Sequence, residues 1–268
     1  GGMKTTILPA LLAAAACGGR ASPICTADPA PADSAVLIDL AIDAVAGDQP
    51  FAMGKRLTSA AGDDFTVSTL RFYLSHLELV DDQGAVVPAV LAEADGTPLE
   101  YGVTLVDYAD PASTTLHLLV PPGHYRSLSL SIGVPEHCED GGELNHENAS
   151  EQNPPLDVDS DMYWGWDPGY VFLKIEGHTS TPKGTTSFLF HVGDDKRYTT
   201  VTMPAVFEVA GAASHRLALD INRFFVTSDG QLSPDPTGVT SSNNSHGGRE
   251  ADVLARNLAS SEVFQWLE

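Results

Sequence analysis

The sequence has few basic residues and none of the common catalytic motifs. Lysine and arginine number 14 against 36 aspartate and glutamate residues, so the formal net charge is −22. Such a surface repels nucleic acid and anionic membranes and favours cations or basic partners, although solubility outside the cell would by itself account for it. G-x-S-x-G, Walker, H-E-x-x-H and C-x-x-C patterns are all missing. We therefore expect a binding protein rather than an enzyme.

Long apolar runs are absent after the N-terminal segment, so no transmembrane helix is expected in the rest of the chain. Two glycines that have the character of a cloning remnant precede Met3, and "MKTTILPALLAAAACGGR" then follows the pattern of a secretory signal peptide. Residues 1–17 end at Cys17, which resembles the lipidated cysteine of a bacterial lipobox; ordinary cleavage among the alanines is the alternative. Both predict export, to the periplasm or, as a lipoprotein, to the outer membrane or cell surface.

Cysteine is scarce, with Cys25 and Cys138 alone beside Cys17. In an oxidising compartment two cysteines favour a disulfide over a metal pair, with free thiols or intermolecular pairing as alternatives. Residues 18–34 are rich in proline, alanine and glycine without a hydrophobic period, which is typical of a flexible tether. Residues 35–268 contain no second linker and are expected to form one domain.

Apolar and polar residues alternate in about nine short runs within that domain. Period-two runs separated by glycine, proline and aspartate turns predict an all-β protein, an antiparallel, Greek-key-like β-sandwich. The runs lie at residues 35–45, 69–80, 101–108, 115–120, 125–134, 170–177, 186–193, 205–211 and 215–226.

Two segments interrupt this pattern. Residues 135–161 are acidic and nearly devoid of apolar residues, which predicts a long loop that is functional or disordered. In the loop, Asp157, Asp159 and Asp161 alternate in a way that suits calcium, although a solvated loop explains them equally well. Near the C-terminus, apolar residues at helical spacing predict a short amphipathic helix; they are Val253, Leu254, Leu258 and Val263.

Histidines and tryptophans supply the candidate site. His191 ends the strand "FLFHVG", and the preceding hairpin strand begins just after Trp164 and Trp166, so these residues should lie at one end of the hairpin. His146, in the long loop, can reach the same end, whereas the strand of His76 cannot be placed. Histidine is a frequent copper and zinc ligand. Taken singly, however, a histidine is more often a hydrogen-bonded residue, and two indoles on one face more often pack in a core.

The sequence resembles the methanobactin-associated copper-binding protein family, MbnP. The resemblance rests on the L-N-H element of "LNHENASEQNPP", the M-x-W-x-W-x-x-G-Y element of "MYWGWDPGY" and the H-hydrophobic-G element of "FLFHVG". It implies an exported β-sandwich that binds copper through histidines and a tryptophan oxidised to kynurenine by a MauG-type di-haem enzyme, MbnH. The implied ligands are His146, His191 and possibly His76, and the modified residue is Trp164 or Trp166.

Two other functions are compatible with the same residues. A β-sandwich adhesion or glycan-binding module would use the indoles as a sugar platform, with incidental histidines. Alternatively, the chain would be an electron-donating substrate of the haem enzyme, with copper irrelevant.

Overall fold

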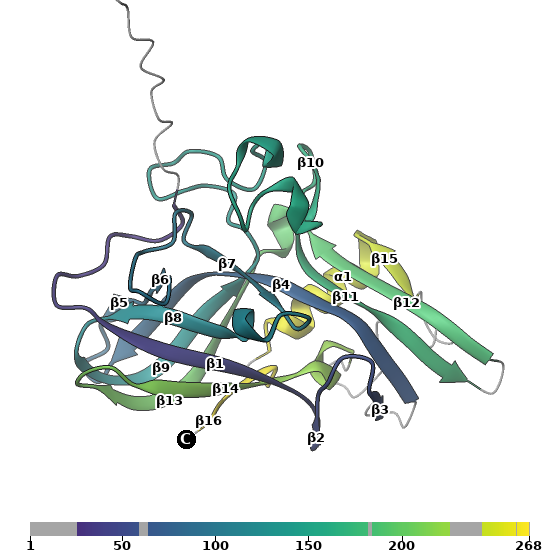
Figure 1. The fold of residues 1–268 in the computed structure, drawn as a ribbon, viewed down its shortest axis with the longest axis horizontal. Helices are drawn as coiled ribbons and strands as arrows, with labels where there is room; N and C mark the ends of the chain where they lie inside the picture. Colours follow the sequence, from purple (N-terminus) through teal and green to yellow (C-terminus); the bar gives the residue numbers. More distant parts are fainter. Residues whose placement is uncertain (1–25, 59–63, 182–183, 226–242, 261, 268) are drawn as a thin grey trace, which may run out of the picture.

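Two β-sheets pack face to face in the computed structural model, which describes residues 26–58, 64–181, 184–225, 243–260 and 262–267 (Figure 1). Each of the nine predicted runs overlaps a strand. The all-β sandwich prediction is confirmed, because alternating apolar residues point to one face of each strand and are buried there.

The smaller sheet has the strand order β16-β14-β1-β8-β6, with β2 paired to β1. These strands are β1 (Val36–Ala46), β2 (Gln49–Pro50), β6 (Val90–Ala92), β8 (Thr115–Val120), β14 (Ser214–Asp220) and β16 (Phe264–Leu267). β1 and β14 pair in parallel, so this sheet is mixed rather than purely antiparallel. A long stretch of chain between the two partners makes this orientation possible.

The larger sheet has the order β13-β9-β4-β11-β12-β15, and β3, β5, β7 and β10 pair at its sides. β15 pairs with β12 in parallel, so this sheet is mixed too. The strands are β3 (Arg56–Thr58), β4 (Asp64–Asp81), β5 (Val86–Pro88), β7 (Val103–Asp107), β9 (Gly123–Ile132), β10 (Tyr163–Gly165), β11 (Gly169–Thr181), β12 (Gly184–Gly193), β13 (Thr199–Val209) and β15 (Asn244–His246).

The predicted C-terminal helix is present as α1 (Gly248–Leu258), which contacts β12 and β13 with its apolar face. Val263 lies beyond the helix and is buried. The prediction missed β16, which follows Val263 and pairs with β14. No helix among the described residues is long and apolar enough to cross a membrane.

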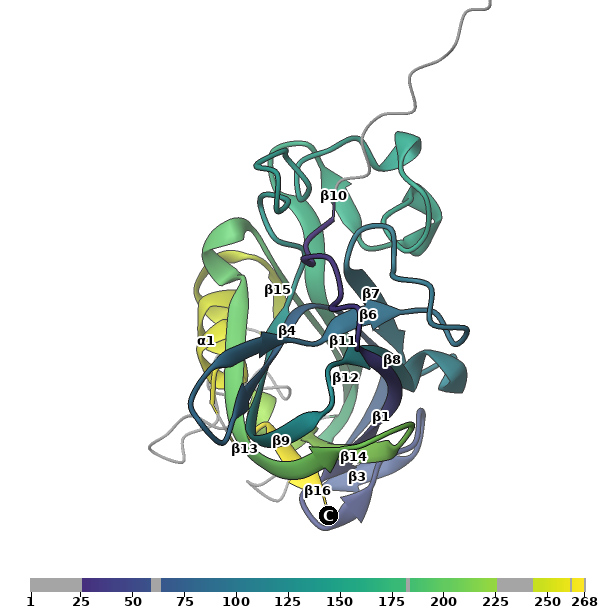
Figure 2. The same cartoon turned by 90° about the vertical axis from the view of Figure 1, so that its left-hand side faces the viewer.

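The predicted long loop is ordered and covers a second apolar cluster. It contains the short 3-10 helices η2 (Ala149–Glu151) and η3 (Val158–Ser160) and lies beyond one end of the sandwich in both ribbon views (Figures 1 and 2). Cys138, Leu144, Ala149 and Leu156 of the loop are buried against aromatic residues of β4 and β11, whereas Val158 is exposed. Further 3-10 turns are η1 (Pro111–Thr114), η4 (Asp195–Arg197) and η5 (Ile221–Phe224).

Part of the predicted tether is attached to the domain. Ala27 donates a backbone hydrogen bond to Tyr101, and the carboxylate of Asp28 accepts one from the backbone N–H of Leu91. Ala27 and Asp28 are both buried. Cys138 is disulfide-bonded. Its predicted partner Cys25 lies outside the described residues, as does Cys17.

Candidate metal site

His191 on β12 and His246 on β15 face each other. They are direct partners in the parallel ladder. Their Nδ1 atoms are 2.9 Å apart, and the rings, with centroids 4.4 Å apart, are nearly perpendicular at 86°. Two N–H groups or two lone pairs at this distance would repel, so one Nδ1 donates a hydrogen bond to the other. His191 is only 5% exposed, whereas His246 is exposed to solvent.

The indole of Trp164 lies beside this histidine pair. Its ring centroid is 6.3 Å from that of His191 and 6.5 Å from that of His246. Gly193 makes room for the indole, because a Cβ at this glycine would lie 2.7 Å from Cζ3 of Trp164. The glycine of the H-hydrophobic-G element therefore has a steric role in placing the indole.

Trp166 has different surroundings from Trp164. Its side chain is 68% exposed, whereas Trp164 is half-buried. Gly165, with φ 138, separates them, and the pairing of β10 with β11 is irregular at this point. The regular alternation expected from the sequence is thus broken, and only Trp164 contacts the histidine pair.

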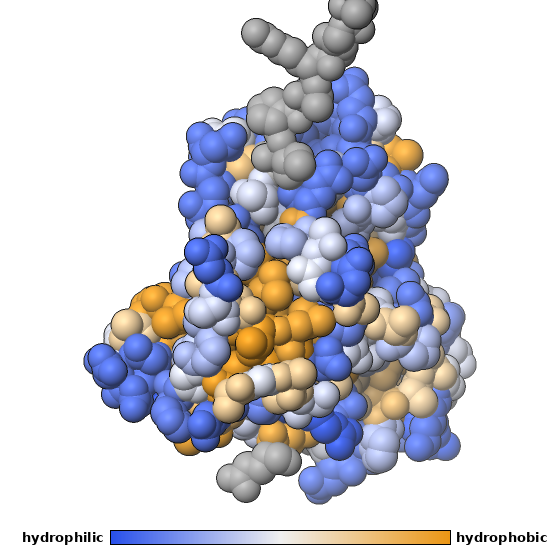
Figure 3. Space-filling model, turned by 60° about the vertical axis from the view of Figure 1, so that its left-hand side comes forward, coloured by the Kyte–Doolittle hydropathy of each residue, from blue (hydrophilic) through white to orange (hydrophobic). Residues whose placement is uncertain are grey.

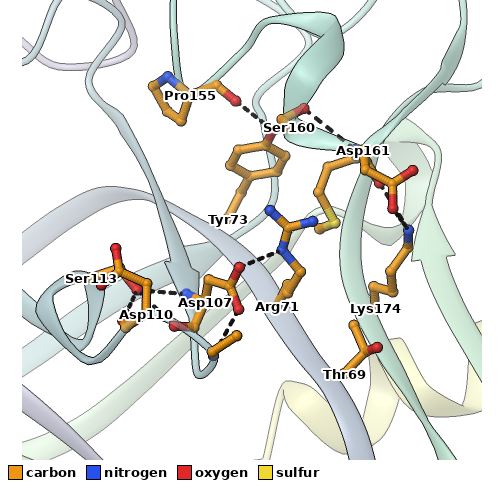
Figure 4. Close-up of polar contacts among 12 residues, drawn as sticks. Thr69, Arg71, Tyr73, Asp107, Asp110, Ser113, Pro155, Ser160, Asp161 and Lys174 are labelled. Carbon is orange, nitrogen blue, oxygen red and sulfur yellow. Dashed lines mark hydrogen bonds and ion pairs between the residues drawn. The ribbon is translucent and has the colours of Figure 1, made fainter.

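A polar row crosses the larger sheet through this pair. Consecutive cross-strand partners on β7, β4, β11, β12 and β15 are Asp107, Arg71, Lys174, His191 and His246. Directly opposed residues of a sheet point to the same face. Lys174 Nζ donates to the carbonyl and carboxylate oxygens of Asp161 at 2.8 and 2.9 Å, and Arg71 Nε lies 3.0 Å from Asp107 Oδ2 (Figure 4). Each cation beside the histidines thus has its own carboxylate.

His191 is held in a neutral state. Burial disfavours the imidazolium and lowers the pKa of His191, although a hydrogen bond with Glu176 acts in the opposite direction. Nε2 of His191 is 2.7 Å from Oε1 of Glu176, and Thr69 Oγ1 donates to the other carboxylate oxygen at 3.1 Å. A neutral imidazole keeps one nitrogen lone pair for a metal ion.

His146 uses both ring nitrogens to join two segments. Nδ1 lies 2.7 Å from the carbonyl oxygen of Trp166, and Nε2 lies 2.7 Å from Oδ2 of Asp195. Burial alone would lower the pKa of His146, but its hydrogen bonds to Asp195 and to the Trp166 carbonyl outweigh that effect and raise it. His146 therefore fastens the long loop to the turn that carries both tryptophans.

His76 lies on β4 with Nδ1 3.0 Å from the hydroxyl oxygen of Tyr198. Its backbone has φ 46, a left-handed conformation. The predicted ligands consequently lie apart, since the histidine that faces His191 is His246, which was not among them. A ligand role for His76 or His146 stays a prediction.

Comparison with known proteins decides the family. The MbnP family model matches residues 36–245. The chain belongs to the MbnP family. Among solved structures, MbnP from Methylosinus trichosporium aligns with a TM-score of 0.57 and 23% sequence identity, covering 78% of this chain and 83% of that one. This likeness shows a common fold. No curated protein sequence matches the chain.

The MbnP family match contains His191, Trp164 and Trp166 but ends one residue before His246. The strand β15 that carries His246 is short and polar. Its place becomes evident only through its pairing with β12. A local signal was available, however, because His246 lies in the segment "SHGGREADVLARNL", which leads directly into helix α1.

The donors at the pair fit a metal ion that prefers imidazole. Imidazole nitrogens suit copper and zinc, and a ligand histidine commonly donates its other N–H to a carboxylate, as His191 can to Glu176. Among the described residues, however, no group of three or more histidine, cysteine, aspartate or glutamate side chains could hold a metal ion. Two imidazoles alone leave the ion short of protein ligands, and the Trp164 indole lies beside them.

The calcium interpretation finds no support in the described part of the chain. Asp157 Oδ1 accepts a hydrogen bond from the backbone N–H of Ser160, which caps η3. Asp161 forms an ion pair with Lys174. Two of the three predicted carboxylates thus have partners within the protein.

Proposed function

We propose that this MbnP-family protein binds copper through His191 and His246 together with Trp164, after a partner enzyme has oxidised that tryptophan to kynurenine. Family membership supports a methanobactin-associated, copper-related role in general. The observation that carries the finer proposal is the position of the Trp164 indole beside two facing imidazoles.

The chemistry explains why an indole would stand at such a site. The lone pair of the indole nitrogen belongs to the aromatic ring, so intact tryptophan offers the ion no donor. Oxidative opening of the pyrrole ring, with loss of one carbon as formate, leaves an aryl amine and a ketone. Either group can complete a set of ligands that otherwise contains only His191 and His246. Copper bound there would be stored or carried, without turnover by this protein.

The oxidant would come from a partner. The chain has no redox motif of its own, and the family resemblance implies a MauG-type di-haem enzyme, MbnH. The half-buried position of Trp164 leaves it near the surface, where oxidising equivalents from a docked enzyme can reach it.

We further propose that the protein is exported and held on a membrane by a lipid on Cys17. Cys17→Ala should then move the protein from the membrane fraction to the soluble fraction.

Peptide mass spectrometry tests the modification. Co-expression with the di-haem enzyme should add one oxygen and remove one carbon in the peptide that holds both tryptophans. Trp164→Phe should abolish this change, whereas Trp166→Phe should retain it. A change that persists in Trp164→Phe and disappears in Trp166→Phe would assign the modification to the exposed indole instead.

Titration with Cu(I) tests the ligands. In protein matured by co-expression, His191→Ala and His246→Ala should each lose most of the affinity. His124→Ala removes an exposed histidine and serves as the control. His76→Ala and His146→Ala belong in the same series, and unchanged Cu(I) affinity in either variant would exclude that histidine as a ligand. Unchanged binding in both His191→Ala and His246→Ala would refute the site.

The geometry favours copper over the glycan-binding alternative. A sugar platform needs exposed aromatic faces, but the Trp164 ring packs on Gly193 beside the histidine pair. Trp166 is the exposed indole of the two. If copper is irrelevant and the chain only donates electrons, the mass change will appear but the affinity for Cu(I) will not depend on His191 or His246.

A further inference from the structure

Glu176 occupies the side of His191 that faces away from His246. Its Oε1 is 2.7 Å from His191 Nε2, while the His191 Nδ1 lies 2.9 Å from His246 Nδ1. The ring nitrogens of His191 therefore have different partners, one a carboxylate and the other an imidazole.

These two contacts fix the proton on His191. A carboxylate only accepts hydrogen bonds, so Nε2 of His191 must carry the proton to make its contact with Glu176. A neutral ring then has its lone pair on Nδ1, pointing at His246. It follows that His246 donates from its own Nδ1 in the metal-free protein.

Glu176 is itself held by the sheet. It lies on β11 directly opposite Thr69 on β4, and the Thr69 hydroxyl donates to its second carboxylate oxygen at 3.1 Å. His191 lies diagonally across from Glu176, because its direct partner on β11 is Lys174. Diagonal neighbours in a sheet are within reach of long side chains. Three adjacent strands thus support one imidazole orientation.

We propose that Glu176, supported by Thr69, is a positioning residue that holds His191 in the tautomer with a free lone pair on Nδ1. His191 can then bind the metal ion without a change of tautomer, whereas His246 must change its tautomer. The tautomer assignment stands on its own geometry, and its consequence for metal affinity rests on the proposed function. Residues that hydrogen-bond to a metal ligand without touching the metal commonly contribute about 10-fold to 100-fold to metal affinity.

Nitrogen-15 NMR of the metal-free protein tests the tautomers. At about pH 8, above the usual imidazole pKa, His191 should show a protonated Nε2 and His246 a protonated Nδ1. Glu176→Met removes the acceptor at similar length and should give His191 a mixture of tautomers. Glu176→Gln retains an acceptor oxygen and should stay close to wild type. An unchanged His191 signal in Glu176→Met would overturn the proposal.

Copper affinity is the second readout. In matured protein, Glu176→Met should bind Cu(I) about 10-fold to 100-fold more weakly than wild type, and Thr69→Val should show a smaller loss. Glu78→Met is the matched control, because Glu78 is an exposed glutamate on β4. On metal binding the His191 tautomer should persist, whereas His246 should move its proton to Nε2.

The two readouts separate this proposal from the proposed function. If wild type binds no Cu(I) but the NMR signals respond to Glu176→Met, the copper proposal fails and the tautomer assignment stands. If wild type binds Cu(I) and Glu176→Met matches it in affinity and tautomer, the role of Glu176 is refuted and the copper site stands. Should Glu176→Met fail to fold, the NMR spectrum of Thr69→Val decides, since an altered His191 signal supports the proposal and an unaltered one refutes it.

Discussion

At the scale of single residues, the candidate site depends on the lack of a side chain at Gly193. Gly193 leaves the space that the six-membered ring of Trp164 fills, and the carbonyl oxygen of Tyr170 lies equally close. A glycine here is required by close approach of other atoms, because Gly193 does not have a positive φ. The two tryptophans therefore differ in role because one of them has a partner in Gly193.

Gly193→Ala should displace the Trp164 indole. The added Cβ would lie 2.6 Å from the Tyr170 oxygen and 2.7 Å from Trp164 Cζ3, so the ring or the strand must move. Overpacking of this kind costs about 1–3 kcal/mol of the free energy of unfolding, measurable by urea denaturation followed by tryptophan fluorescence. Gly211→Ala is the control, because a Cβ there has no atom within 4 Å. Equal stability of the two variants would contradict the steric role of Gly193.

Asp28 should make stability depend on pH. Burial raises its pKa from 3.8 to about 7, although the hydrogen bond from Leu91 N–H acts in the opposite direction. Between these values the folded state binds more protons than the unfolded state, so this contribution to stability is full below about pH 4 and is lost as pH rises through 7.

Asp28→Asn removes this ionisation while keeping an oxygen that can accept from Leu91. At about pH 8 the variant should be more stable than wild type by roughly 2–4 kcal/mol, and at about pH 4 the two should be nearly equal. Chemical denaturation at both pH values gives the comparison, with the exposed Asp33→Asn as control. A stability gain that is the same at both pH values would contradict the ionisation of Asp28 as its cause.

At the scale of strands and helices, the spacing of apolar and polar residues along the sequence predicted most of the fold. The run "TLHLLV" alternates cleanly because one face of its strand is buried, and it forms a strand. The run "FLFHVG" also forms a strand, although its last four residues are all buried. The failures are short elements whose existence depends on distant partners. β16 and β15 have four and three residues, too few to show a period, and each exists through pairing with β14 or β12.

Contacts between residues distant in the sequence also limited the prediction of the candidate site. His191 and the tryptophans share one hairpin, so sequence order was enough to bring them together. His246 reaches His191 through a parallel pairing across 55 residues of sequence. His146 was predicted to lie at the correct end, but its hydrogen bonds to Asp195 and Trp166 depend on side-chain directions that no sequence period specifies.

Phe264→Ala tests whether β16 is part of the core. Phe264 is 1% exposed and packs edge-on against Phe72 across the sandwich, with ring centroids 6.5 Å apart. Truncating a buried phenylalanine leaves a cavity and costs about 3–5 kcal/mol of the free energy of unfolding. Gln265→Ala, at the next and exposed position of the same strand, should change stability little. If both variants unfold at the wild-type urea concentration, β16 does not contribute to the core.

At the scale of the whole molecule, the described residues form two apolar clusters that include residues of the larger sheet. The main cluster fills the space between the sheets and includes residues of α1 and β16. The second lies under the long loop and combines Ala27, the disulfide-bonded Cys138 and Met162 with aromatic residues of the sheet. Because Met162 is two residues from Trp164, the second cluster anchors the segment that carries the candidate site.

The face shown in Figure 3 carries an apolar patch surrounded by polar side chains. With 36 acidic and 14 basic side chains, most carboxylates have no basic side chain available to neutralise them. Surface ion pairs contribute only about 0–1 kcal/mol each, so at a net charge of −22 we expect mutual repulsion of the carboxylates to outweigh them. The net electrostatic effect of the surface is therefore expected to oppose the folded state at neutral pH.

Added salt should consequently stabilise the protein. Raising ionic strength from about 0.01 M to about 0.15 M shortens the screening length from about 30 Å to about 8 Å, which weakens long-range repulsion more than contacts between paired charges. The melting temperature at neutral pH should therefore rise, equally in NaCl and KCl, since screening does not depend on the identity of the cation. Near pH 4.5, the isoelectric point, the rise should nearly vanish because the net charge does. A melting temperature that falls with salt at neutral pH would mean that the ion pairs outweigh the repulsion, whereas a rise specific to one cation would indicate that ion binding, not screening, stabilises this acidic surface.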